Sequence, residues 1–160
     1  MLGKFTPKQN LNIPPLKYGY VYKLKEDFPE DEIIINGGIS SVEEIGTHLK
    51  RVDGVMIGRA VYHTPYLLAK IEKEIFKNDD IPSRQAVIEQ LIPYIKDELK
   101  KGTRLNQIMR HTLGLFHGQT GSSYWKRYLS ENMCVRDADI QKIDHIMDKI
   151  KYNNIEARVG

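Results

Sequence analysis

Apolar residues follow two different patterns along this chain, and the pattern changes near residue 60. Before that point stand two short apolar runs, Ile33–Ile35 and Val55–Ile57, and each leads into a turn that contains glycine. Runs of this kind are typical of strands buried on both faces of a parallel sheet covered by helices. The sequence therefore predicts two buried parallel strands in this part of the chain.

A helical pattern of apolar residues precedes each of these two strands. A helix is expected over residues 18–28, with three apolar residues on its inward side: Val21, Leu24 and Phe28. A second helix is expected over residues 41–50, beginning with a capping box in which Ser41 and Glu44 each bind the other's backbone N–H group. The first 60 residues thus predict the order helix, strand, helix, strand.

After Pro65 the strand signal disappears and helical periodicity remains. Apolar residues recur three and four positions apart in several segments: 66–76, 83–99, 105–116, 124–133 and a last one that Asp139 caps. Ser83 is expected to be the N-cap of its helix, and Trp125 is interpreted as a core anchor. The second half therefore predicts a small helical bundle.

Composition places the chain among globular proteins. Of its 160 residues, 41% are hydrophobic and 28% charged, and no apolar run approaches a membrane span. Cys134 is the only cysteine, so an intrachain disulfide cannot form and a cytoplasmic location is expected. No cysteine and histidine spacing suggests a metal site. His111 and His117 are interpreted as surface or core-edge residues, because no acid lies near them in sequence.

The net charge of +3 is small, but the basic residues of the second half are concentrated in one stretch. Between Leu99 and Ser130 the chain carries basic residues and no acid: Lys100, Lys101, Arg104, Arg110, Lys126 and Arg127. An acid-free basic stretch interleaved with aromatic residues is typical of a surface for polyanions. A solvated helical face with few acids explains the same pattern, and the sequence leaves both readings open.

The turn after the first strand, Asn36-Gly37-Gly38, raises a similar choice. Paired glycines permit a sharp turn, and they also let a ligand such as phosphate approach the backbone closely before a helix begins. From these residues alone, a turn without a ligand is an equally good explanation. Two strands do not form a domain by themselves. The chain is therefore expected to begin in the middle of a larger architecture.

Five ordered motifs carry a resemblance to a known family. They are PKQN…IPPL (7–16), INGGI (35–39), VDGVMIGRAVY (52–62), RHTLGLFHG (110–118) and WKRYLSEN (125–132). Together they cover nearly the whole chain, and their order and spacing resemble the carboxyl-terminal part of the A-type bacterial tRNA-dihydrouridine synthases.

The resemblance implies a fold of class α/β plus α. Residues 1–78 would be the last strands and helices of an FMN-binding (β/α)8 TIM barrel, which is incomplete here, and residues 79–160 a helical tRNA-binding domain. It also implies an activity: FMN-dependent, NADPH-linked reduction of uridine to 5,6-dihydrouridine in tRNA.

Functional residues follow from the same resemblance. The FMN phosphate would be held by backbone around the two glycine turns and by one arginine: Asn36, Gly37, Gly38, Gly58 and Arg59. The general-acid cysteine of the family lies in the first half of the barrel, so no catalytic residue is expected in this chain, which alone should be inactive. Cys134 is interpreted as a buried small apolar residue.

The resemblance further implies contacts to tRNA by Lys8, Ser123, Lys126 and Arg127. The subfamily has two pairs of basic residues, which align with Lys8 and Leu11 and with Ser123 and Lys126, so each pair has lost one charge. A polypeptide carrying the first half of the barrel is a further expected partner; a membrane is not. The alternatives are a non-catalytic tRNA-binding remnant and, less favoured, another FMN barrel oxidoreductase such as a dihydroorotate dehydrogenase.

Overall fold

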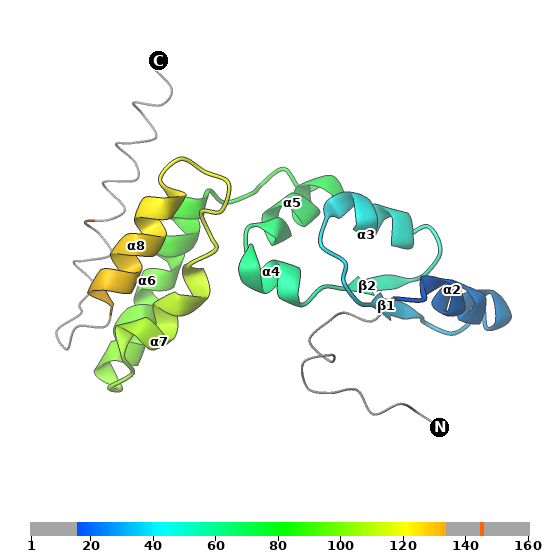
Figure 1. The fold of residues 1–160 in the computed structure, drawn as a ribbon, viewed down its shortest axis with the longest axis horizontal. Coiled ribbons are helices and arrows are strands. Elements are labelled where there is room, and N and C mark those ends of the chain that lie inside the picture. Colours follow the sequence, from blue (N-terminus) through cyan, green and yellow to red (C-terminus); the bar gives the residue numbers. More distant parts are fainter. Residues whose placement is uncertain (1–15, 134–144, 146–160) are drawn as a thin grey trace, which may run out of the picture. The chain divides into compact units, whose positions relative to one another are not determined.

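The computed structural model describes residues 16–133 and residue 145, which divide into two compact units after Ala60. Within its described residues, the first unit contains α2 (Tyr18–Asp27), β1 (Ile34–Asn36), α3 (Val42–His48) and β2 (Gly54–Met56), and the two strands form a sheet (Figure 1). Helix α4 (Arg59–His63) crosses the boundary. The second unit continues with α5 (Leu67–Glu74), α6 (Arg84–Lys100), α7 (Leu105–Met109), the 3-10 helix η1 (Arg110–Thr112) and α8 (Ser122–Asn132).

The two predicted strands exist and pair in parallel. Ile34 lies opposite Gly54, Ile35 opposite Val55 and Asn36 opposite Met56. Burial on both faces was predicted, and that prediction is wrong for this chain. Ile35 is 1% exposed, whereas Ile34 is 57% and Met56 47% exposed, because alternation along a strand sends them to the opposite face from Ile35.

Helix α2 forms where predicted, but its inward side differs. Leu24 and Phe28 are exposed, while Lys25, expected to point outward, lies 2.8 Å from the Asp53 carboxylate. Tyr18 and Tyr22 pack on the buried His48 of α3, with ring centroids 4.6 and 5.9 Å apart. Aromatic and charged partners within the unit thus orient α2, and of the three residues expected inward only Val21 is half-buried.

The capping box of α3 is confirmed. The Glu44 N–H donates to Ser41 Oγ at 3.2 Å, and the Ser41 N–H donates to Glu44 Oε2 at 3.1 Å. The Ser40 N–H donates to the same carboxylate oxygen at 2.7 Å. These backbone donors, Ser40 first, hold the pKa of Glu44 below its ordinary value. Helix α3 buries Val42 and Ile45, and Ile35 of β1 is buried as well.

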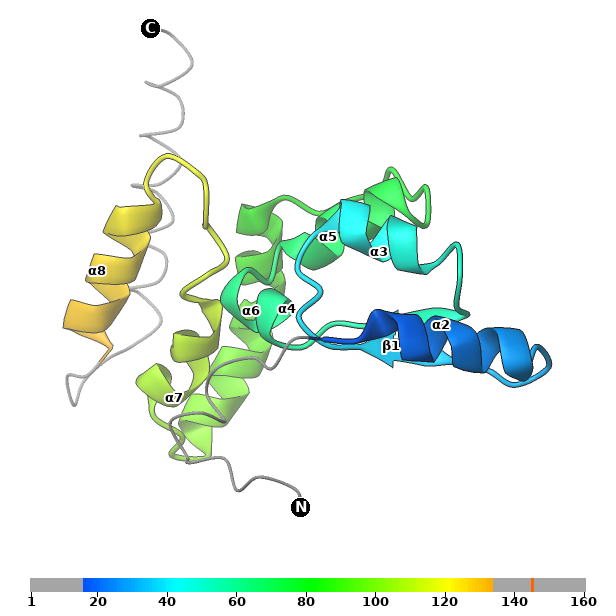
Figure 2. The same cartoon turned by 45° about the vertical axis from the view of Figure 1, so that its right-hand side comes forward.

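The second unit has its core between α6, α7 and α8 (Figures 1 and 2). Fully buried residues from these helices and the loop before α8 form one cluster, which includes Ile88, Ile95, Met109, Phe116 and Trp125. Ser83 caps α6 as predicted, with its Oγ accepting from the Ala86 N–H at 3.1 Å. The prediction of Trp125 as core is confirmed, since the side chain is 0% exposed.

The helix expected over residues 105–116 ends early. Regular α-helix stops at Met109, and turns follow η1 up to α8. Gly114 packs so closely that an added Cβ would lie 1.9 Å from the His63 carbonyl oxygen. The Trp125 Nε1–H donates to the Thr112 carbonyl at 3.0 Å. In a continuing α-helix, that carbonyl would instead accept from the backbone N–H four residues later. The apolar residues of this segment that recur at helical spacing are nevertheless buried, namely Leu105, Ile108, Met109 and Phe116.

Outside the described residues lie the helix capped by Asp139, the expected burial of Cys134 and the predicted contact residue Lys8. Among the residues that the structure describes, no helix is long and apolar enough to cross a membrane.

Candidate functional site

The two glycine turns lie at one edge of the sheet. Because β1 and β2 are parallel and Asn36 pairs with Met56, their carboxyl ends come together. Gly37 and Gly38 directly follow β1, and Gly58 lies two residues beyond β2. The residues predicted to surround a phosphate are thus brought to the same edge from segments about 20 positions apart.

The Gly37-Gly38 turn requires glycine for its own conformation. The φ angles are +125° and +62°, a region that side chains with a Cβ rarely adopt. A Cβ on Gly37 or Gly38 would also lie 3.1 or 2.9 Å from the Leu16 side chain. The Tyr18 hydroxyl donates to the Gly37 carbonyl and fixes the turn from the same side. At these two positions, the fold alone accounts for glycine.

Gly58 and Arg59 present a different situation. Gly58 has no positive φ, and a Cβ added there would meet nothing within 4 Å. The fold therefore places no demand for glycine at this position. Arg59 is exposed and makes no ion pair with any described residue. This side of the edge is open, with a guanidinium next to it.

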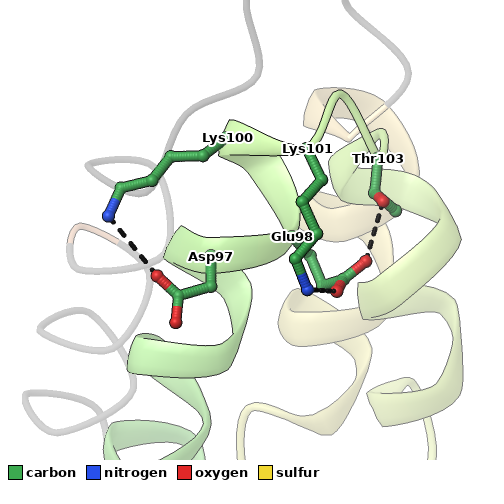
Figure 3. Close-up of polar contacts among 5 residues, drawn as sticks. All are labelled: Asp97, Glu98, Lys100, Lys101 and Thr103. Atoms are coloured by element: carbon green, nitrogen blue, oxygen red, sulfur yellow. Dashed lines mark hydrogen bonds and ion pairs between the residues drawn. The ribbon is translucent and has the colours of Figure 1, made fainter.

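Two cations of the acid-free basic stretch are paired with acids that lie just before it. Lys100 pairs with Asp97 at 3.4 Å and Lys101 with Glu98 at 2.8 Å, and Glu98 also accepts from Thr103 at 2.8 Å (Figure 3). The bond to Glu98 raises the pKa of Lys101, and the same contact lowers the pKa of Glu98. The acids lie just before the acid-free stretch, so sequence reasoning overlooked this neutralisation.

Helix α8 carries the predicted RNA-contact residues on its outer side. Ser123, Lys126 and Arg127 are exposed, while Trp125 faces the core. The Arg127 guanidinium lies 5.9 Å from the ring centre of Tyr124. Unlike Lys100 and Lys101, neither cation of α8 pairs with an acid among the described residues. Lys8, the remaining predicted contact, lies outside the described residues.

A further cluster escaped sequence reasoning. Tyr62 and His111, which are 49 positions apart, contact each other through Tyr62 Oη and His111 Nδ1 at 3.3 Å. The Arg110 Nε–H donates to His111 Nε2 at 3.2 Å. The signals available in the sequence were two of the five motifs, VDGVMIGRAVY, which ends at Tyr62, and RHTLGLFHG, which begins at Arg110. Among the described residues, no group of histidines, cysteines and acids could hold a metal ion.

The described residues thus form an α/β protein, rich in helix, with a small parallel sheet whose carboxyl edge carries two glycine turns. Comparison with known families refines this class. The profile of the dihydrouridine synthase (Dus) family matches residues 3–151, and the chain belongs to that family.

Curated relatives agree with this membership. A tRNA-dihydrouridine(20/20a) synthase of Synechocystis sp. is 44% identical over 96% of this chain and 46% of its own length. The protein of that name in Escherichia coli K12 is 48% identical over 91% of the chain and 43% of its own length. The one in Shewanella oneidensis is 45% identical over 98% and 45%. The chain spans about half the length of the curated relatives it matches.

Proposed function

We propose that this chain is the carboxyl-terminal part of an FMN-dependent, NADPH-linked tRNA-dihydrouridine synthase that acts in the cytoplasm. The observation that carries the proposal is the meeting of two glycine turns and Arg59 at one sheet edge, in a member of the Dus family. A phosphate site formed by the loops after the last two strands is a common feature of TIM barrels.

In this proposal, β1 and β2 are strands seven and eight of the barrel. Residues 1–78 complete the barrel and residues 79–160 form the tRNA-binding domain. The exposed Ile34 and Met56 support this arrangement, because apolar residues on a two-stranded sheet need further strands and side chains to cover them. The relatives' greater length supports it too. The first half of the barrel is then the required partner.

Asn36, Gly37, Gly38, Gly58 and Arg59 would hold the FMN phosphate. Two features fit a phosphate. The open space at Gly58 lets a ligand approach the backbone, and the unpaired guanidinium of Arg59 offers a forked set of donors. FMN would supply the hydride that reduces the C5–C6 bond of uridine, with NADPH as the electron source. The general-acid cysteine would come from the other half, so this chain anchors the flavin and the tRNA.

The phosphate site is tested in a chimaera in which this chain replaces the portion of the Synechocystis relative that it matches. Gly58→Ala should lower the FMN content of the purified chimaera, because a methyl group would occupy the phosphate's approach. Arg59→Ala should weaken FMN binding by about 1.5–3 kcal/mol, as for a hydrogen bond to a charged group.

Gly19→Ala is the matched control for Gly58→Ala. Gly19 also lacks a positive φ, and an added Cβ there also meets nothing within 4 Å. If Gly58→Ala and Gly19→Ala retain equal FMN, the turn at Gly58 has no part in holding the flavin. Gly38→Val is a poorer test, because its clash with Leu16 would disturb the turn without any ligand.

The tRNA surface is tested with two double variants that each remove two positive charges. Lys126→Ala with Arg127→Ala should weaken tRNA binding and reduce the slope of log K against log salt by about one to two units. Lys100→Ala with Lys101→Ala should change the slope less, because those lysines are already paired with acids. Equal slopes for both doubles would mean that net charge, and not α8, governs binding.

A further inference from the structure

The Tyr62 cluster, formed by Tyr62, Arg110 and His111, combines a ring and a cation on the surface of the second unit. Tyr62 belongs to α4, and Arg110 and His111 belong to η1. The Tyr62 and His111 rings meet edge to face, with centroids 5.8 Å apart at 72°. The His63 ring meets Tyr62 in the same manner at 5.9 Å. Contacts from two elements therefore hold the Tyr62 ring in one orientation.

The hydrogen bonds of this cluster determine which groups remain available. An arginine Nε–H can only donate, so His111 Nε2 accepts and the ring proton lies on Nδ1. Nδ1–H then donates to Tyr62 Oη. The hydroxyl proton of Tyr62 remains free to be donated outward, and the terminal N–H groups of Arg110 are likewise available.

Exposure and charge give the cluster its chemical character. Tyr62 is 57% exposed, and His63, Arg110 and His111 are exposed as well. None of these four pairs with an acid among the described residues. Phe116 and Trp125 are buried in the core of the unit, whereas the exposed Tyr94 is not part of this cluster. Tyr62 thus offers an oriented ring with positive charge beside it.

We propose that the Tyr62 cluster is a second RNA-contact site, which stacks an unpaired base of tRNA on the Tyr62 ring. Single-stranded nucleotides are recognised by stacking on aromatic side chains and by donors that meet base or phosphate oxygens. The ring, the Tyr62 hydroxyl and the Arg110 guanidinium supply these functions together. This site differs from the one proposed on α8, whose cations would meet phosphates. The inference rests on the proposed function, because it requires that the chain bind tRNA.

The test is a titration of fluorescently labelled, unmodified tRNA with the full chain at several salt concentrations. Tyr62→Ala should weaken binding about tenfold, since stacking of one base is lost, and should leave the salt slope unchanged. Tyr62→Phe should retain most of the affinity, because the ring remains. Tyr94→Ala is the matched control: Tyr94 is 54% exposed in α6 and should have no effect. Trp125 fluorescence verifies that each variant is folded.

The possible results distinguish failure of the stacking site from failure of the proposed tRNA binding. If the parent chain binds tRNA and Tyr62→Ala binds equally well, the cluster is no RNA site, while the proposed function stands. A reduced salt slope in Tyr62→Ala would also overturn the stacking assignment. If the parent chain does not bind tRNA at all, the proposed tRNA binding by this chain fails, and the inference fails with it.

Discussion

Gly114 offers the sharpest test of how the second unit is packed. A Cβ built on this residue would lie 1.9 Å from the His63 carbonyl oxygen, 2.8 Å from its carbon and 3.2 Å from Pro65 Cδ. An ordinary contact requires about 3.4 Å, so backbone would have to move by about 1.5 Å. Because the obstacle is backbone and not a flexible side chain, Gly114→Ala should cost about 3 kcal/mol or more, at the upper end for overpacking.

The assay is urea unfolding followed by Trp125 fluorescence. Trp125 is the single tryptophan, fully buried, with its ring 4.9 Å from that of Phe116, two residues after Gly114. Gly118→Ala serves as a control for backbone strain alone, since Gly118 has φ +74° and no atom near an added Cβ. Its cost should be about 1 kcal/mol. If the two variants unfold at the same urea concentration, the close packing at His63 is refuted.

Two further perturbations test other contacts. The Arg84 guanidinium stacks on the Tyr66 ring at 3.7 Å, and its Nε–H donates to the Leu115 carbonyl at 2.9 Å. Arg84→Lys should therefore lower the free energy of unfolding by about 1–2 kcal/mol. An unchanged urea midpoint would contradict this. Backbone donors, that of Ser40 first, lower the pKa of Glu44 in the folded state, so its contribution to stability is complete above the ordinary value of 4.5 and is lost as pH falls through the folded pKa. Glu44→Gln should flatten this acid dependence, measured by circular dichroism, and a parallel curve would exclude Glu44 as a source.

Features set by local chemistry could be predicted from the sequence. The capping box at Ser41, the N-cap at Ser83 and the burial of Trp125 depend on neighbours within a few residues or on strong apolar character. Both strands were found to within a residue for the same reason. The glycine turns were also recognised, together with their position at the ends of strands.

Features set by distant partners could not be predicted. Nothing in the local pattern indicates that Tyr62 contacts His111, or that the His63 carbonyl packs against Gly114 and leaves no room for a Cβ. The reading of β1 as buried on both faces assumed cover that Ile34 does not have in this chain. The acid-free stretch was defined by its own residues, whereas Lys101 takes its partner from the preceding turn of α6.

We propose that this chain completes a tRNA-dihydrouridine synthase, and formation of the product is the decisive measurement. The chimaera with the Synechocystis relative is incubated with unmodified tRNA, FMN and NADPH, and the nucleosides are analysed by mass spectrometry. We expect dihydrouridine from the chimaera and none from this chain alone. A folded chimaera that retains FMN but forms no dihydrouridine, while the unaltered Synechocystis protein does, would contradict it.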